Sequence, residues 1–151
     1  MWPIGRSAVS EKYKILRQVI EAWTARDIDG VLAHMADDIV WHYAVAIAPP
    51  LKGKTSARKL LEKMAADTSD LHWRIFDYAE RGDRLFIEGA EDYLASSGAR
   101  VATAYAGVLE FRGGLISAWR DYLDIGAVNA QADGQPTPNW VTAMIGRPVA
   151  V

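Results

Sequence analysis

Residues 115–125 read LISAWRDYLDI, and this stretch alternates as a half-buried strand does. Its apolar side chains Trp119, Leu123 and Ile125 fall on one face. Asp121 falls on that same face. An ionised carboxylate among apolar side chains costs free energy unless it is paired or its pKa changes. We therefore expect Asp121 to be either a structural hydrogen-bond acceptor or the functional centre of the fold.

The strand that contains Asp121 is the last of several consecutive strand-like runs. These runs cover residues 71–79, 84–95, 100–111 and 115–125. The segments between them contain the glycines that tight hairpin turns favour. Consecutive hairpins predict an antiparallel meander.

The N-terminal half of the chain has helical periodicity instead. Apolar residues recur at the spacing of one helix face in residues 10–27, 27–38 and 55–67. A β-branched and aromatic strand, residues 39–47, precedes Pro49-Pro50, where neither residue can donate to a ladder. Three N-terminal helices covering one face of a strongly curved antiparallel sheet predict a cone-shaped α+β fold.

The length and composition fit one domain with one core. The chain has 151 residues, of which 50% are hydrophobic. We expect a single domain over residues 1–151, with its core at residues 10–127. A looser tail, residues 128–151, should disorder, exchange with another copy or fold over the mouth of the cone, because glycine and prolines interrupt it.

Charge and composition exclude several classes of partner. A net charge of −2 with scattered Lys and Arg offers no basic patch for nucleic acid or an anionic membrane. The chain has no cysteine, which removes disulfides and thiolate chemistry and fits a reducing compartment. No segment approaches the roughly 20 apolar residues of a membrane span, and the N-terminus shows no signal-peptide pattern. We expect a soluble, cytoplasmic protein.

Metal and cofactor motifs are also absent from the sequence. His34, His42 and His72 show no ligand spacing with carboxylates that would indicate a metal site. The glycines of residues 111–114 and 126–134 do not form a phosphate-binding loop ahead of a helix. No serine lies in a nucleophile-elbow context. We predict a mechanism that needs neither metal nor cofactor.

The order of these elements and the sequence WRDY at residues 119–122 resemble the nuclear-transport-factor-2-like superfamily. The resemblance spans residues 10–127 and is nearest to the limonene epoxide hydrolase and SnoaL-like polyketide cyclase branch. In those hydrolases an aspartate on the last strand activates water, and a second aspartate protonates the epoxide oxygen. The resemblance places Asp121 as the water activator and Asp92 as the proton donor. An arginine that bridges the two carboxylates in the hydrolases falls at Ala90 and is absent.

Without that arginine, Asp92 and Asp121 would share an apolar cavity with no cation between them. One should then keep its proton at neutral pH while the other acts as a base. Such a pair can open an epoxide, and it can equally move a proton beside a carbonyl, as isomerases and cyclases on this scaffold do. A ligand-binding module without turnover is the third interpretation. Glu88 is in step with Asp92, and a register slip to Glu91 would turn Asp92 to solvent.

The predicted substrate is a small, mainly apolar molecule that carries oxygen. The side chains expected to bind it are Trp41, Tyr43, Leu94, Thr103, Tyr105, Trp119 and Leu123. The resemblance places Trp41 and Tyr43 where a tyrosine and an asparagine hold the water in the hydrolases.

A second apolar face on the sheet predicts a homodimer. Phe76 and Tyr78 alternate with the cavity-facing residues of their strand, together with Arg74. Ala102, Ala104 and Ala106 leave a smooth patch on the same face. A sheet that is apolar on both faces usually buries both, so we expect two copies to pair there.

Overall fold

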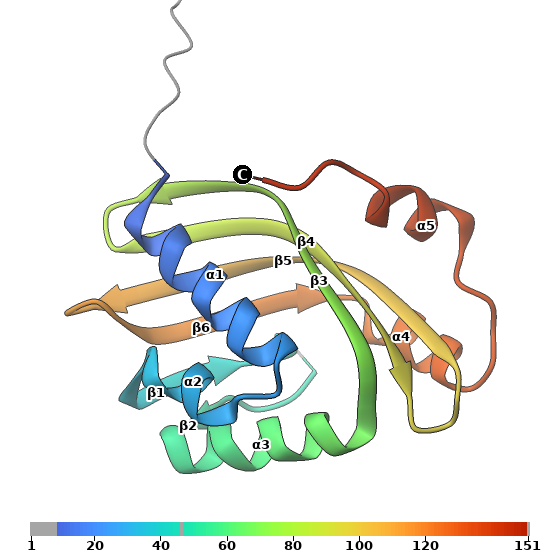
Figure 1. The fold of residues 1–151 in the computed structure, drawn as a ribbon, viewed down its shortest axis with the longest axis horizontal. Coiled ribbons are helices and arrows are strands. Elements are labelled where there is room, and N and C mark those ends of the chain that lie inside the picture. The colour runs from blue at the N-terminus through green and yellow to red at the C-terminus, as the bar shows by residue number, and fades with distance from the viewer. Residues whose placement is uncertain (1–8, 46, 151) are drawn as a thin grey trace, which may run out of the picture.

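The computed structural model describes residues 9–45 and 47–150. Ala46, at the end of the expected strand 39–47, and the ends of the expected domain, 1–8 and 151, lie outside the described residues. The elements in chain order are α1 (Glu11–Thr24), α2 (Ile28–Ala33), β1 (Met35–His42), β2 (Leu51–Lys52), α3 (Lys54–Asp67), β3 (Thr68–Arg81), β4 (Arg84–Ala95), β5 (Arg100–Arg112), β6 (Leu115–Leu123), α4 (Ile125–Ala132) and α5 (Asn139–Ile145) (Figure 1). The predicted α+β class is confirmed.

The strands form one curved, open sheet of six strands in the order β2-β1-β6-β5-β4-β3. The predicted antiparallel meander from β3 to β6 is confirmed. The expectation of an antiparallel sheet throughout is wrong at one junction, because β1 pairs with β6 in parallel, with Trp41 beside Trp119. A helix and four strands separate β1 from β6 in the chain, and so long a connection permits a parallel pair.

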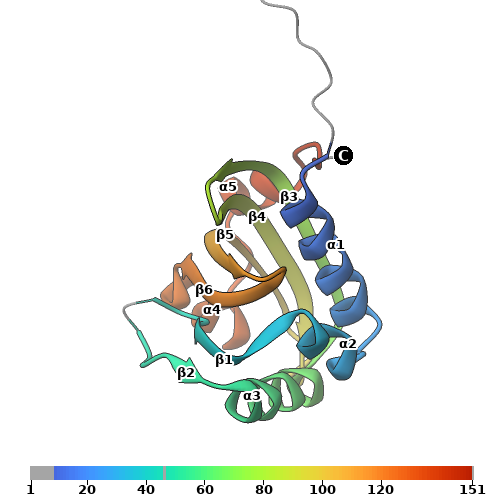
Figure 2. The same cartoon turned by 90° about the vertical axis from the view of Figure 1, so that its left-hand side faces the viewer.

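The helices α1, α2 and α3 lie along the concave side of the sheet, as Figures 1 and 2 show. Apolar side chains from both layers meet there, and Leu16, Ile39, Leu85 and Leu109 are fully buried. Ser10 caps α1 by accepting a hydrogen bond from the Tyr13 amide. Among the described residues, no helix has the length and apolar composition needed to cross a membrane.

Strand register decides which side chains face the helices. Glu91 pairs with Thr103, Tyr105 pairs with Leu123, and Gly107 pairs with Asp121. Because side chains alternate along a strand, these odd-numbered positions share the concave face and their even-numbered neighbours face outward.

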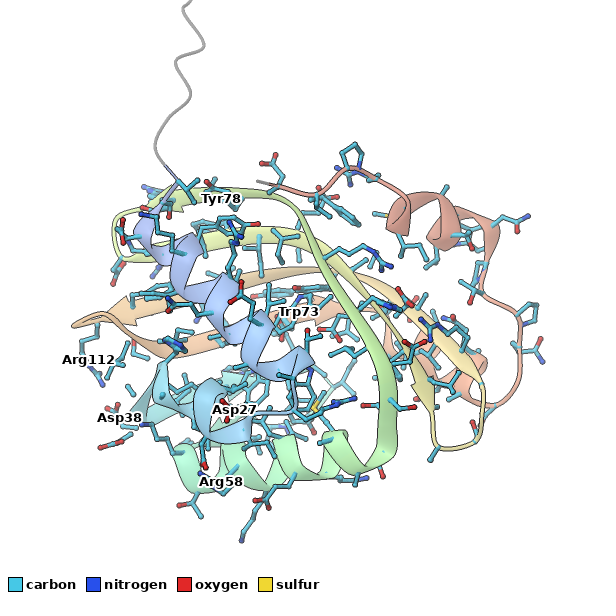
Figure 3. All side chains as sticks on the ribbon, viewed as in Figure 1. Asp27, Asp38, Arg58, Trp73, Tyr78 and Arg112 are labelled. Atoms are coloured by element: carbon cyan, nitrogen blue, oxygen red, sulfur yellow. The ribbon has the colours of Figure 1, made fainter. Side chains whose placement is uncertain are left out.

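A β-bulge in β3 reverses this alternation. The register shifts between Ile75 and Asp77, so Tyr78 turns to the helix side (Figure 3). There it stacks on Tyr13 of α1, with ring centroids 4.0 Å apart. The expectation that Tyr78 belongs to the outer face with Phe76 is therefore wrong, because the bulge inserts one extra residue.

The expected looser tail instead forms two helices, with Gly134, Pro136 and Pro138 in the segment between them. The buried amide of Gln131 on α4 donates to the Ala102 carbonyl and accepts from the Ala102 amide, each at 2.9 Å. This side chain replaces the strand partner that β5 lacks beyond the end of β6.

The helix α5 and the residues after it pack on the outer face of β4 and β5 (Figure 1). Arg147 pairs with Glu88 at 2.7 Å and lies over the Phe76 ring at 4.9 Å. The Ala150 amide donates to the Ile75 carbonyl at 2.7 Å. The chain's own tail thus covers part of the predicted dimer surface, and the homodimer stays a prediction.

Gly89 tests how tightly β3 and β4 fit together at the bulge. A Cβ atom at residue 89 would lie 2.4 Å from the Arg74 carbonyl oxygen, a backbone atom. We expect Gly89→Ala to lower the free energy of unfolding by about 1–3 kcal/mol, as overpacking does. Urea unfolding measures the change.

Gly146→Ala is the matched control, because its added Cβ would meet nothing closer than 3.8 Å. Its effect should stay within about 0.5 kcal/mol. Equal unfolding free energies for the two variants would contradict the packing described for Gly89.

Candidate active site

A cavity of about 350 Å³ lies between the concave face of the sheet and the helices. Its volume fits the range of about 300–1,000 Å³ in which small-molecule sites fall. The wall is mainly apolar, with Val19, Trp23, Leu61 and Leu71 among its side chains. Ile125 and Val128 of α4 also contribute to the wall. The cavity is therefore suited to a small and largely apolar molecule.

Most of the side chains predicted from the sequence line this cavity. They are Asp121, Trp41, Tyr43, Thr103, Tyr105, Trp119 and Leu123. Leu94 and Asp92 do not line it, because their even-numbered positions on β4 face outward. Leu94 is 37% exposed on the outside of the sheet, so its predicted role in binding the substrate is corrected.

Asp92 lies in an ion-pair cluster on the outer face of β4. Its carboxylate accepts from Arg74 and Arg100, and one of its oxygens lies 3.0 Å from Nδ1 of His72. Burial alone would raise the pKa of Asp92, but hydrogen bonds with Arg74, His72 and Arg100 outweigh it and lower the pKa to about 2. A carboxyl with that pKa stays ionised near neutrality and cannot serve as a proton donor. The placement of Asp92 beside Asp121 is corrected accordingly.

Glu91, the neighbour of Asp92, faces the cavity instead. Its side chain is partly exposed. Among the described residues, no side chain or backbone group makes a hydrogen bond with its carboxyl oxygens. Burial raises the pKa of Glu91 to about 7. Glu91 therefore holds a proton during part of the physiological pH range.

Asp121 projects from β6 into the same cavity. Trp119 donates its indole N–H to one carboxyl oxygen of Asp121 at 2.8 Å. Gly107 on β5 leaves the room that this carboxyl needs, since a Cβ there would lie 3.0 Å from the same oxygen. Burial raises the pKa of Asp121 to about 8, against the lowering effect of the Trp119 hydrogen bond, and the charge of Glu91 raises it further.

Glu91 and Asp121 share the cavity, and their carboxyls interact electrostatically. Each carboxyl has a pKa close to neutral, and a charge on Glu91 raises the pKa of Asp121. The cationic side chain that the described residues contribute to the cavity lining is Lys63, which is exposed and paired with Asp67. The bridging arginine of the resemblance is absent in either register, since Ala90 lies two residues before Asp92 and Gly89 lies two residues before Glu91. Near neutrality one carboxyl can thus be an acid while the other is a base.

Two polar groups of the cavity wall are placed to hold an oxygen atom. The buried Trp41 Nε1 has no hydrogen-bond partner among the described residues, yet Trp41 lowers the pKa of Asp121. Trp73 donates its indole N–H to the Tyr105 hydroxyl. Trp41 and Trp73 each lie 6.0 Å from Trp119 between ring centroids, so the three indoles form one wall.

Glu91 is a cavity carboxyl that the sequence analysis does not single out, and Trp73, expected only in the core or the pocket wall, lies in the cavity wall. The sequence contains a signal for Glu91. The buried Leu85 and Ile87 define the inward face of β4, and Glu91 alternates in step with them. Trp73 pairs directly with Glu91 across β3 and β4.

Residues 16–119, more than half of the chain, match the SnoaL-like domain family. The protein belongs to this family. The predicted relationship to the nuclear-transport-factor-2-like superfamily is confirmed. No curated protein matches this SnoaL-like chain in sequence.

Several solved structures share the fold of this SnoaL-like protein. An LEH-like epoxide hydrolase from M. tuberculosis is 24% identical, with 82% of this chain and 91% of that chain covered and a TM-score of 0.70. An NTF2-like protein from Burkholderia pseudomallei is 19% identical, with coverage of 82% and 98% and a TM-score of 0.74. A Delta 5-3-ketosteroid isomerase from Mycobacterium sp. is 18% identical, with coverage of 79% and 97% and a TM-score of 0.71. The scaffold therefore occurs in both a hydrolase and an isomerase.

The contributions of Asp92 and Asp121 to the free energy of unfolding of this SnoaL-like protein should change with pH in opposite directions. Asp92 has a lowered pKa, so its ionised form stabilises the fold above pH 4, and this stability is lost as pH falls toward 2. Asp92→Asn should lower the free energy of unfolding by about 2 kcal/mol at neutral pH. The deficit should disappear at a pH of about 2.

Asp121 has a raised pKa, so its contribution to the free energy of unfolding is favourable below pH 4. This contribution is lost as pH rises through about 8. Asp121→Asn escapes this loss and should gain at least about 1 kcal/mol at alkaline pH, the equivalent of one pKa unit. Urea unfolding of both variants across pH measures the two trends. A destabilised Asp121→Asn at high pH would contradict the account of the cavity.

Proposed function

We propose that this protein is a cofactor-independent acid/base enzyme that opens the epoxide ring of a small apolar molecule with water. The observation that carries the proposal is the pair of cavity carboxyls, Glu91 and Asp121, whose pKa values lie close to neutral. Enzymes that need an acid and a base in one site use such pairs.

Asp121 acts as the base in this proposal. The hydrogen bond from Trp119 favours its ionised form and fixes the direction of the carboxylate. A water molecule in the cavity would donate a hydrogen bond to the Asp121 carboxylate. That arrangement leaves a lone pair of the water oxygen for attack on carbon.

Glu91 acts as the acid. The water oxygen bonds to one epoxide carbon while the bond from that carbon to the epoxide oxygen breaks. Asp121 takes a proton from the water, and Glu91 gives a proton to the epoxide oxygen, so the product is a vicinal diol. The reaction leaves Asp121 protonated and Glu91 ionised, and one proton returned from Asp121 to Glu91 restores the starting state.

In this proposal the apolar wall replaces the bridging cation of the hydrolases that this chain resembles. Without a cation, ionising both carboxyls together is unfavourable in a cavity of low polarity. The cavity therefore favours the singly protonated pair. Because the pKa of Asp121 is the higher of the two, the form with the proton on Glu91 is the less populated of the two singly protonated forms, and the reaction starts from it.

A second candidate function, isomerisation or cyclisation with the same pair, is supported by Tyr105. Its hydroxyl lines the cavity with the two carboxyls and can donate to a carbonyl oxygen. In that reaction one carboxylate removes a proton beside the carbonyl, and no water is consumed. A binding module without turnover is the outcome if neither reaction occurs.

Turnover of cyclohexene oxide in water enriched in heavy oxygen tests the proposal. Hydrolysis should place one solvent oxygen in each diol molecule, as mass spectrometry of the product shows. Conversion to a product without solvent oxygen would replace hydrolysis by the isomerase candidate.

Neighbouring residues on β4 supply matched variants for this assay. Glu91→Gln and Asp121→Asn should each lower kcat by about 10²–10⁴-fold, as loss of a general acid or base does. Asp92→Asn should keep kcat close to that of the parent protein, because Asp92 lies outside the cavity. A loss with Asp92→Asn that equals the loss with Glu91→Gln would overturn the assignment of roles.

A further inference from the structure

The Tyr105 hydroxyl can both accept and donate a hydrogen bond, and the fold uses it as an acceptor. Its hydroxyl oxygen accepts from Trp73 Nε1. Among the described residues, no acceptor receives the hydroxyl proton. Because an indole N–H only donates, the phenolic proton has to point away from Trp73. Tyr105 is 8% exposed and lines the cavity, so this free donor belongs to the cavity.

The sheet holds the Tyr105 ring in one place. Tyr105 lies between Gly89 and Leu123 in the register of β4, β5 and β6. A Cβ at Gly89 would lie 3.2 Å from the ring, so the glycine leaves the space that the ring occupies. Burial and the nearby carboxyls of Glu91 and Asp121 raise the pKa of Tyr105 well above its ordinary value, so the hydroxyl stays protonated.

The charges around the cavity favour an uncharged ligand. Glu91 and Asp121 face the interior, and an anionic ligand would add a further negative charge beside them. The described cation in the lining, Lys63, is exposed and already paired with Asp67. The wall of three indoles offers flat apolar surface to a ring.

We propose that Tyr105 donates its phenolic proton to the oxygen of the substrate, with Trp73 as the positioning residue, and that the cavity takes neutral ring compounds with one acceptor oxygen. The proposal rests on the proposed function for the site it describes, but it concerns ligand recognition and holds for an epoxide or a ketone. In the hydrolysis, Tyr105 binds the epoxide oxygen while Glu91 protonates it.

Two probes of matched shape test this recognition without turnover. Indan-1-one carries a carbonyl oxygen, and indane has the same ring system without it. Calorimetric titration should show that the parent protein binds the ketone up to about 10-fold more tightly than the hydrocarbon, the effect of one hydrogen bond. Tyr105→Phe keeps the ring and should remove most of this preference. An unchanged preference in Tyr105→Phe would overturn the proposal.

Trp73→Phe separates positioning from packing. The substitution removes the indole donor, so the hydroxyl of Tyr105 loses its fixed direction. The affinity for both probes should fall through lost contact area, and the ketone preference should also shrink, by about 2–5-fold. Equal losses for the two probes would show that Trp73 only packs and would overturn its positioning role.

The probe-binding and heavy-oxygen experiments together distinguish this proposal from the proposed function. A ketone preference that depends on Tyr105, together with no solvent oxygen in the products, supports the recognition and rejects the hydrolysis. The hydrolysis is supported if solvent oxygen enters the product and its incorporation depends on Glu91 and Asp121. If kcat, KM and probe binding are then unchanged in Tyr105→Phe, the recognition by Tyr105 is rejected.

Discussion

The arrangement of the site depends on two carboxyl groups that share one apolar cavity. Among the described residues, the cation in the cavity lining is Lys63, which is exposed and paired with Asp67. Glu91 and Asp121 reach this cavity from different strands, and burial raises the pKa of both toward neutral. In an ordinary core such a pair would be a defect, because removing carboxylates from water costs free energy. Here the same cost shifts the protonation equilibrium so that one carboxyl can act as an acid and the other as a base. Asp121 lies in step with Trp119 and Leu123 because all three side chains project from one face of β6 into the cavity.

The fold supplies the room that this arrangement requires. Gly107 accommodates the Asp121 carboxyl, and Gly89 accommodates the Tyr105 ring, so two missing side chains on neighbouring strands open the cavity where the polar groups lie. Trp119 and Trp73 then direct the carboxyl and the hydroxyl through their indole N–H groups. On the other face of the sheet, Asp92 is held by two arginines and has a lowered pKa. Adjacent acidic residues of one strand thus have opposite roles, because the pleat turns one into an apolar cavity and the other toward cations.

Local patterns in the sequence predict the helices, the meander and the inward face of β6, because helical and strand periodicity are short-range properties. They therefore place Asp121 correctly. The family resemblance places the proton donor at Asp92, whereas the alternation of β4, in which Leu85 and Ile87 are buried, predicts that Glu91 faces inward. The bulge that turns Tyr78 toward α1 has no local signal, since its strand alternates regularly in sequence. The parallel contact of β1 with β6 and the covering of the outer face by the tail arise from distant segments, which local periodicity cannot reveal.

The protonation of the two cavity carboxyls is the central claim, and carbon NMR of side-chain carboxyl groups measures it directly. Selective labelling of Glu and Asp carboxyl carbons, assigned with Glu91→Gln and Asp121→Asn, gives each titration curve. We expect midpoints of about 7 for Glu91 and about 8 for Asp121, and a lower midpoint for Asp121 once Glu91 is replaced by Gln. Titration of both carboxyls at about 4, as in model peptides, would contradict the account.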